Sequence, residues 1–313
     1  MADFTIVTPV LNQASTIEAC IQSVANQDVD VDHIIVDGGS TDGTVDIIKK
    51  YEHVLTYWES EKDKGQSHAI NKGLAKANGT FFNWLNADDV LTEDALSTVL
   101  KSAKPNSLAV VGKCKHVNEN GEELAIGSAK IWDSLEATLG NYSMGQPSLF
   151  YKTAVVKELG GLNESLHLCM DMDLWFRFLL KNGQTNVSIC DSILSRFRVA
   201  ESAKSGRFSQ QMQSEKYAIY HALASNFSLP TCLEQFFNEH QIPTGVELLP
   251  SDGFKPEEFL SNFSWHLMLL AFENGDFSLC QEFLEIVKAG NRLSNAEILL
   301  WKGRIASKTI LSK

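Results

Sequence analysis

The first part of the chain alternates short apolar runs with segments of helical periodicity. Helical patterns of period 3.6 lie between the runs, and the pattern from Gln66 to Ala77 is followed by Asn78-Gly79, a typical helix end. This order of elements predicts an α/β fold with a mostly parallel sheet that helices cover on both faces. The four predicted strands are residues 4–10, 33–37, 55–58 and 80–85.

Polar clusters stand where three of these strands end. Thr8-Pro9 lies near the end of the first run, Asp37-Gly38-Gly39 closes the second, and Asp88-Asp89 follows the fourth. Parallel sheets bind ligands beyond the carboxyl ends of their strands. The three clusters therefore predict one ligand site along this edge of the sheet.

The rest of the chain divides into a mixed middle part and a helical end. Asn120-Gly121 predicts a hairpin, and after about residue 206 no further strand pattern occurs. We therefore expect a sheet-containing domain at residues 1–205 and a helical region at 206–313. Expected elements are a strand at 146–151 and helices at 170–180, 258–274, 277–288 and 295–307.

Composition and charge narrow the class of protein. The chain has 313 residues, 44% of them hydrophobic and 21% charged, which is typical of a globular protein. Its net charge of -12 argues against nucleic acid as a partner, because phosphate binding needs clustered lysine and arginine. None of the six cysteines stands at C-x-x-C spacing. No signal-peptide pattern opens the sequence and no apolar stretch reaches ~18 residues, so we expect a cytoplasmic protein with at most peripheral membrane contact.

The segment Asn86-Ala-Asp88-Asp89 carries the sharpest chemical signal. Adjacent carboxylates after a buried strand repel each other, which is costly unless a cation lies beside them. Oxygen ligands of this kind suit Mn²⁺ or Mg²⁺ shared with substrate phosphates. The alternative is that these acids only cap the following helix, whose first turn is itself acidic.

Two loops have the character of nucleotide-binding turns. In the loop from Asp37 to Thr44, glycines allow close approach of a ligand, and Asp37 can accept a hydrogen bond from a base or a ribose. The alternative is a tight turn with a Ser40 or Thr41 cap. The loop from Glu61 to Gly73 enters a helix whose N-terminus suits a diphosphate, although an exposed surface loop has the same composition.

Two acids, Asp171 and Asp173, open the helix predicted at 170–180. Positions i and i+2 point about 200° apart on a helix, so only one of them can face a cleft. The cleft-facing acid is a candidate general base and the other is structural. The alternative is that both merely complement the helix dipole.

A basic segment, residues 196–205, contains Arg196, Arg198 and Lys204 within an otherwise acidic chain. Such a segment can close over a diphosphate leaving group. A run of solvated charges is the alternative explanation.

Taken in order, these motifs resemble the inverting glycosyltransferases of family 2, which have the GT-A fold. The resemblance covers roughly residues 3 to 205. The matching motifs are Thr8-Pro-Val-Leu-Asn12, Val36-Asp-Gly-Gly-Ser-Thr-Asp-Gly-Thr44, Glu61-Lys-Asp-Lys-Gly65, Ala69-Ile-Asn-Lys-Gly73, Asn86-Ala-Asp-Asp89 and Met170-Asp-Met-Asp-Leu-Trp175.

The resemblance assigns a role to each candidate residue. It implies a nucleoside-diphosphate-sugar donor, with a UDP-sugar expected, and a hydroxyl acceptor on a glycan or glycolipid, as in polysaccharide or glycoconjugate biosynthesis. A divalent metal would neutralise the departing diphosphate, and a base would take the acceptor proton as the anomeric configuration inverts. The implied donor-binding residues are Thr8, Pro9, Asp37, Asp63, Asn71, Asp88 and Lys204; the implied metal ligands are Asp88 and Asp89; and the implied base is Asp171.

The chain departs from the family pattern at three positions. Gly38 stands where relatives often have a second acid, Ile70 where many have an arginine, and Asn86 where the first acid of a D-x-D motif is usual. The last change shifts the metal-binding role to Asp88 and Asp89.

Two other functions remain open from the sequence. One is a sugar-nucleotide-binding or scaffold protein without catalysis, against which the joint presence of Asp89 and Asp171 argues. The other is a nucleotidyltransferase, which would need a basic glycine-rich loop after the first strand. The helical end matches no family that we can name, and its large apolar faces predict packing on the catalytic domain or on a second copy of the chain.

Overall fold

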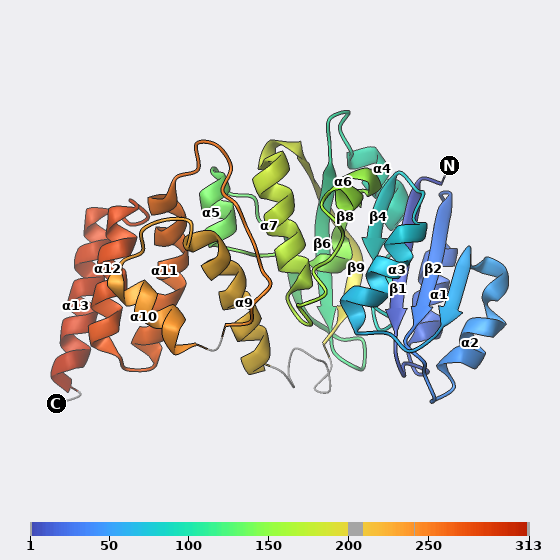
Figure 1. The fold of residues 1–313 in the computed structure, drawn as a ribbon, viewed down its shortest axis with the longest axis horizontal. Coiled ribbons are helices and arrows are strands. Elements are labelled where there is room, and N and C mark those ends of the chain that lie inside the picture. Colours follow the sequence, from blue (N-terminus) through green and yellow to red (C-terminus); the bar gives the residue numbers. More distant parts are fainter. Residues whose placement is uncertain (1, 200–208, 241, 312–313) are drawn as a thin grey trace. The chain divides into compact units, whose positions relative to one another are not determined.

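A computed structural model describes residues 2–199, 209–240 and 242–311 of the chain (Figure 1). In this described part, nine strands form one sheet in the order β3-β2-β1-β4-β8-β6-β9-β5, with β7 paired to β6. Lys204 lies outside the described residues.

The four predicted strands are present and are parallel to one another. β1 lies between β2 and β4, and β3 pairs with β2. Val10 is in register with Asp37, so the ends of β1 and β2 reach the same edge of the sheet. The bounds are β1 Phe4–Val10, β2 Val31–Asp37, β3 Tyr57–Ser60 and β4 Phe81–Trp84.

The second half of the sheet is mixed rather than parallel. β8 is antiparallel to β4 and β6, whereas β6 and β9 are parallel. The predicted hairpin joins β6 to β7, with Gly121 at φ +82° in its turn. A short 3-10 helix, Gln146–Ser148, takes the first half of the strand predicted at 146–151. The bounds are β5 Val90–Leu91, β6 Ala109–Val117, β7 Glu123–Ser128, β8 Leu149–Lys152 and β9 Val187–Arg198.

Helices cover both faces of the sheet, as the strand pattern predicts. Successive residues of a strand point to opposite faces of the sheet, so Ile6 and Val7 of β1 lie on different faces. Ile6 and Phe150 belong to a buried cluster with side chains of α1 and α4. On the other side, α3 approaches Val7 closely, and Tyr151 contacts aromatic rings of α7. The bounds are α1 Ile17–Ala25, α2 Thr44–Lys50, α3 Gln66–Lys76, α4 Ala95–Ser102, α6 Thr153–Glu158 and α7 Met170–Asn182.

The chain forms two compact units, which are described separately. The first holds residues 1–130 and 143–212 and contains the sheet, and the second holds 131–142 and 213–313. The second unit is helical, and the three helices predicted there are confirmed. Its helices are α5 Leu135–Gly140, α9 Ser209–Ala224 (whose first turn belongs to the sheet-containing unit), α10 Thr231–Glu239, α11 Pro256–Glu273, α12 Phe277–Ala289 and α13 Asn295–Leu311.

Segment 131–142 belongs to the helical unit although it comes from the middle of the sequence. Its helix α5 packs on α11, and the Asn141 side-chain amide donates to Asn262 Oδ1 at 2.7 Å. A domain boundary at residue 205 stays a prediction. In the described part of the chain, no helix combines the length and apolar character needed to cross a membrane.

Candidate active site

A cavity of about 790 Å³ opens in the sheet-containing unit, where β1 and β4 end. Its size is in the range of small-molecule sites. Four predicted site residues line it together, namely Pro9, Asp63, Asp88 and Asp171. These residues are far apart in the sequence, so the fold brings the donor and base candidates to one space.

The turn after β4 divides its two acids. Asp88 lines the cavity, whereas Asp89 is fully buried. Asp89 Oδ2 accepts a hydrogen bond from the Asn86 amide at 3.1 Å, and Oδ1 accepts one from the main-chain N–H of Arg198 at 3.0 Å. Burial raises the pKa of the Asp89 carboxyl well above its usual range, and the Asp88 carboxylate adds to the rise.

The carboxylate oxygens of this turn fit a hard divalent cation whose remaining ligands would come from a bound substrate. Within the described residues, no three histidine, cysteine or acidic side chains form a ready-made metal cluster. Mg²⁺ and similar ions are commonly held by one or two carboxylates together with substrate phosphates. Asp88 offers a carboxylate from the cavity wall, and a cation bound there would favour the ionised form of the buried Asp89 next to it in the chain.

The turn after β2 is held in place by hydrogen bonds to the side chain of Asp37. Asp37 is fully buried, and its Oδ2 accepts from the main-chain N–H groups of Gly39 at 3.0 Å and Ser40 at 2.9 Å and from the Ser60 hydroxyl at 2.6 Å. Gly39 has φ +89°, which a residue with a side chain adopts rarely. Asp37 thus holds the turn together and is not among the residues that line the cavity.

Asp63 stands beside Gly38, the position at which the sequence departs from the pattern of the family it resembles. A Cβ at position 38 would come within 2.8 Å of Asp63 Oδ2, so the glycine leaves room for this carboxylate. Asp63 Oδ1 accepts from the Gly65 N–H at 2.8 Å, and both Asp63 and Gly65 line the cavity. An acid from the next loop therefore occupies this place.

Thr8 lies beneath the cavity rather than on its wall. It is fully buried, and its Oγ1 is 2.9 Å from His33 Nε2. Burial lowers the pKa of His33 to about 3, so this ring is neutral. Thr8 thereby ties β1 to β2, while Pro9 next to it lines the cavity.

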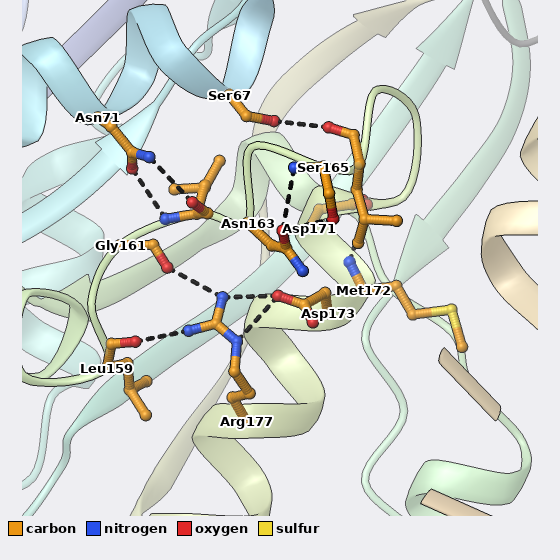
Figure 2. Close-up of polar contacts among 12 residues, drawn as sticks. Ser67, Asn71, Leu159, Gly161, Asn163, Ser165, Asp171, Met172, Asp173 and Arg177 are labelled. Carbon is orange, nitrogen blue, oxygen red and sulfur yellow. Dashed lines mark hydrogen bonds and ion pairs between the residues drawn. The ribbon is translucent and has the colours of Figure 1, made fainter. Parts of the chain in front are cut away.

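Helix α7 also separates its two acids. Asp171 lines the cavity and accepts a hydrogen bond from the Met172 N–H at 2.8 Å. Asp173 is 1% exposed and accepts from Arg177 Nε at 2.8 Å and Nη2 at 2.6 Å (Figure 2). The two side chains diverge as helical geometry requires.

The side chain of Asn71 forms hydrogen bonds with the loop that contains Leu162. Its Nδ2 donates to the Leu162 carbonyl at 2.9 Å, and its Oδ1 accepts from the Leu162 N–H at 2.8 Å (Figure 2). The same Nδ2 also donates to Glu164 Oε1 at 3.0 Å. It is not among the residues lining the cavity. Donor contact by Asn71 stays a prediction.

The basic segment contributes one described arginine to the cavity wall. Arg198 Nη1 donates to the Glu119 carbonyl at 3.0 Å, and within the described chain its buried Nε has no hydrogen-bond partner. The basic residues of this segment make it a candidate for contact with a diphosphate in the sequence. Two other lining residues, Glu119 and Gln146, carry no motif and were missed.

Comparison with known proteins identifies the family. Residues 5–156 match the model of glycosyl transferase family 2. The PGL/p-HBAD biosynthesis glycosyltransferase of Mycobacterium tuberculosis is 39% identical over 187 residues, which are 56% of this chain and 68% of that relative. The chain belongs to glycosyl transferase family 2. A second relative of this family 2 glycosyltransferase, the GalNAc(5)-diNAcBac-PP-undecaprenol beta-1,3-glucosyltransferase of Campylobacter jejuni, is 31% identical over 119 residues, 36% of this chain and 38% of the relative.

Solved structures show that this glycosyltransferase has the GT-A fold. S. aureus TarS matches at a TM-score of 0.59 and 17% identity over 98% of this chain, which spans 53% of TarS. TarS 1–349 in complex with UDP-GlcNAc matches at 0.57 and 18%, covering 98% of this chain and 89% of that one. The mannosyltransferase PcManGT of Pyrobaculum calidifontis, in complex with GDP-Man and Mn²⁺, matches at 0.54 and 14% over 99% and 80% of the two chains.

Proposed function

We propose that this family 2 glycosyltransferase is an inverting, divalent-metal-dependent enzyme that transfers a sugar from a UDP-sugar to a hydroxyl group of a glycan or glycolipid. One observation carries the proposal. Asp88 and Asp171, the candidate metal ligand and the candidate base, line the same cavity although they lie on different elements. Such an arrangement serves a reaction between two bound substrates.

On the donor side, Asp88 and Asp89 would hold Mn²⁺ or Mg²⁺, and the bound ion would neutralise the diphosphate. Arg198 adds a cation on the same wall, suited to the phosphates. Pro9 and Asp63 offer surfaces for the nucleoside. The complexes of TarS with UDP and UDP-GlcNAc, and of PcManGT with GDP-Man and Mn²⁺, support a nucleotide-sugar donor and a metal.

On the acceptor side, Asp171 would remove the proton of the attacking hydroxyl. Attack on the anomeric carbon from the face opposite the diphosphate inverts the configuration at that carbon. The glycoconjugate relatives support a glycan or glycolipid acceptor. Cytoplasmic location, peripheral membrane contact and self-association through residues 206–313 stay predictions.

A thermal-shift screen of UDP, GDP and their sugar derivatives, with and without Mn²⁺, tests the donor assignment. A ligand that binds only the folded state raises the melting temperature, so UDP or a UDP-sugar should give the largest shift and should need the metal. Slow Mn²⁺-dependent donor hydrolysis should accompany binding. Binding without hydrolysis or transfer would favour a catalytically inactive sugar-nucleotide-binding protein. No metal-dependent shift with any nucleotide would refute the proposal.

A further inference from the structure

Residues 159–169 connect α6 to α7, and α7 carries Asp171 near its start. Side chains from two different helices grip this connection (Figure 2). The connection has no regular secondary structure except turns, and its main-chain hydrogen bonds are made by the N–H groups of residues 159–161 and of Leu166. The side-chain contacts add to these bonds and attach the connection to α3 and α7.

The first grip comes from α3. Asn71 pairs with both main-chain polar groups of Leu162, at 2.9 and 2.8 Å, and the Ser67 hydroxyl donates to the Leu166 carbonyl at 2.9 Å. Ser67 is buried, so its bond has no competition from water. One face of α3 thus holds the connection at two points.

The second grip comes from α7 itself. The Arg177 guanidinium donates to the carbonyls of Leu159 at 2.8 Å and Gly161 at 2.9 Å, and it also pairs with the buried Asp173. The planar fork of an arginine suits such multiple contacts, which a lysine cannot reproduce. Arg177 therefore fastens the start of the connection to the helix that follows it.

A glycine makes the close fit possible. Gly161 has φ +77°, and a Cβ at this position would come within 2.5 Å of Asn71 Oδ1. Both the backbone conformation and the lack of space exclude a side chain there. The connection is thus shaped for contact with Asn71.

Helix α3 also reaches the donor side of the cavity. Its first residue, Gln66, lines the cavity and donates from Nε2 to Asn86 Oδ1 at 2.7 Å. Asn86 in turn bonds to Asp89. A single helix therefore touches the turn of the candidate metal ligands at one end and the connection to Asp171 along its length.

We propose that Asn71 and Arg177 are positioning residues that set Asp171 relative to the donor by fixing residues 159–166 between α3 and α7. This inference rests on the proposed role of Asp171 as the base, and it takes the place of the donor contact that the family resemblance implies for Asn71. A base displaced by about 1 Å can cost on the order of 100-fold in rate, so a clamp of this kind acts on turnover without touching a substrate.

Asn71→Asp tests the clamp, because it is nearly isosteric but removes both N–H donors and sets a carboxylate against the Leu162 carbonyl. We expect kcat to fall roughly 10- to 100-fold while donor affinity stays within about twofold. Lys181→Gln is the matched control. It breaks the exposed ion pair of α7 with Glu158, 2.9 Å long, and should leave kcat unchanged.

The decisive measurement repeats Asn71→Asp in an Asp171→Asn background. A positioning residue should cost nothing further once the base is gone, whereas a residue that only supports the fold should cost the same factor again. If Asn71→Asp does not fold, Ser67→Ala, a milder loss of one bond, takes its place in both backgrounds. Parental kcat in these variants, or equal losses in both backgrounds, would overturn the inference while leaving the proposed function intact. Parental turnover in Asp171→Asn alone would instead remove the proposed base, and the inference with it.

Discussion

Two pairs of acids stand at the cavity, one after β4 and one at the start of α7, and they share a plan. In each pair the first member lines the cavity and the second is buried beneath it. The pairs differ in what neutralises the buried member. Asp173 lies against the guanidinium of Arg177, whereas Asp89 is bonded to a neutral amide and a main-chain N–H.

This difference separates a structural acid from one prepared for a ligand. Burial raises the pKa of both carboxyls. Arg177 opposes the rise at Asp173, whereas at Asp89 the charge of Asp88 adds to the rise and the hydrogen bonds and the charge of Arg198 oppose it less. At α7 the buried acid thus has a cation in direct contact. At β4 the printed hydrogen bonds of the buried acid come from an amide and a main-chain N–H, so a cation bound nearby would lower the cost of its negative charge.

The largest expected effect is at the wall position of α7. Asp171→Asn keeps the shape and hydrogen bonding of the side chain but cannot take a proton, so turnover should fall ~10² to 10⁴-fold with donor binding retained. Asp173→Asn should keep most turnover and lower the melting temperature. Rates and donor affinities of both variants check this. A dead Asp173→Asn with an active Asp171→Asn would reverse the two roles.

Next in size is the loss of the arginine beneath the wall. Arg177→Met leaves Asp173 buried without its cation, which should cost about 3–5 kcal/mol of unfolding free energy at neutral pH. Without Arg177 the folded-state pKa of Asp173 rises further above its unfolded value. The folded state then binds the proton more tightly, so the deficit should grow as pH rises from 5 to 8.

Denaturant unfolding of Arg177→Met and the parent at pH 5 and pH 8 measures this effect. Adding Asp173→Asn to Arg177→Met should recover part of the loss and remove its pH dependence. A deficit that is the same at both pH values would show that Asp173 is not the group left unpaired.

A smaller effect is expected at the buried member of the β4 pair. Asp89→Ala should weaken Mn²⁺-dependent donor binding roughly 10- to 100-fold and leave the fold intact. Glu93→Gln, an exposed acid shortly after the same turn, is the control and should change nothing. Titrations with UDP in the presence and absence of Mn²⁺ decide the matter. Equal affinities with and without Mn²⁺ in the parent would mean that this pair holds no metal.

The smallest effect is expected at Tyr151, behind the wall of α7. Its hydroxyl is buried and, among the residues described, has no hydrogen-bond partner, while burial and then the charge of Asp171 raise its pKa. Tyr151→Phe removes a polar group that folding desolvates, so stability should stay equal or rise by up to about 1 kcal/mol, with turnover unchanged. A clear fall in kcat would show that Asp171 depends on this hydroxyl.

The first half of the sheet could be predicted from the sequence because buried parallel strands consist of short runs of apolar residues. β9 was missed because its exposed and buried positions follow no regular alternation over Val187–Arg198. The short helix α5, with six residues, is too brief for a periodic signal. Its place in the helical unit depends on packing against α11, which local sequence does not encode.

For the candidate site, the motifs predicted the acidic residues near the cavity. They predicted less well what each of these residues contacts. Asp88 and Asp171 reach the cavity, as the strand-end and helix arguments anticipated. Asp37 accepts a hydrogen bond from Ser60, which is 23 positions away in the sequence, and the hydrogen bond from Asn71 to Leu162 spans 91 positions. Pairings over such distances arise only when the chain is folded.

The division of the chain between the two compact units determines which stretches of sequence can be exchanged without breaking a packing contact. The helical unit takes residues 131–142 from within the sheet-containing unit's sequence and 213–313 from the end. Exchanging only the C-terminal region between two chains of this kind would therefore separate α5 from its partner α11.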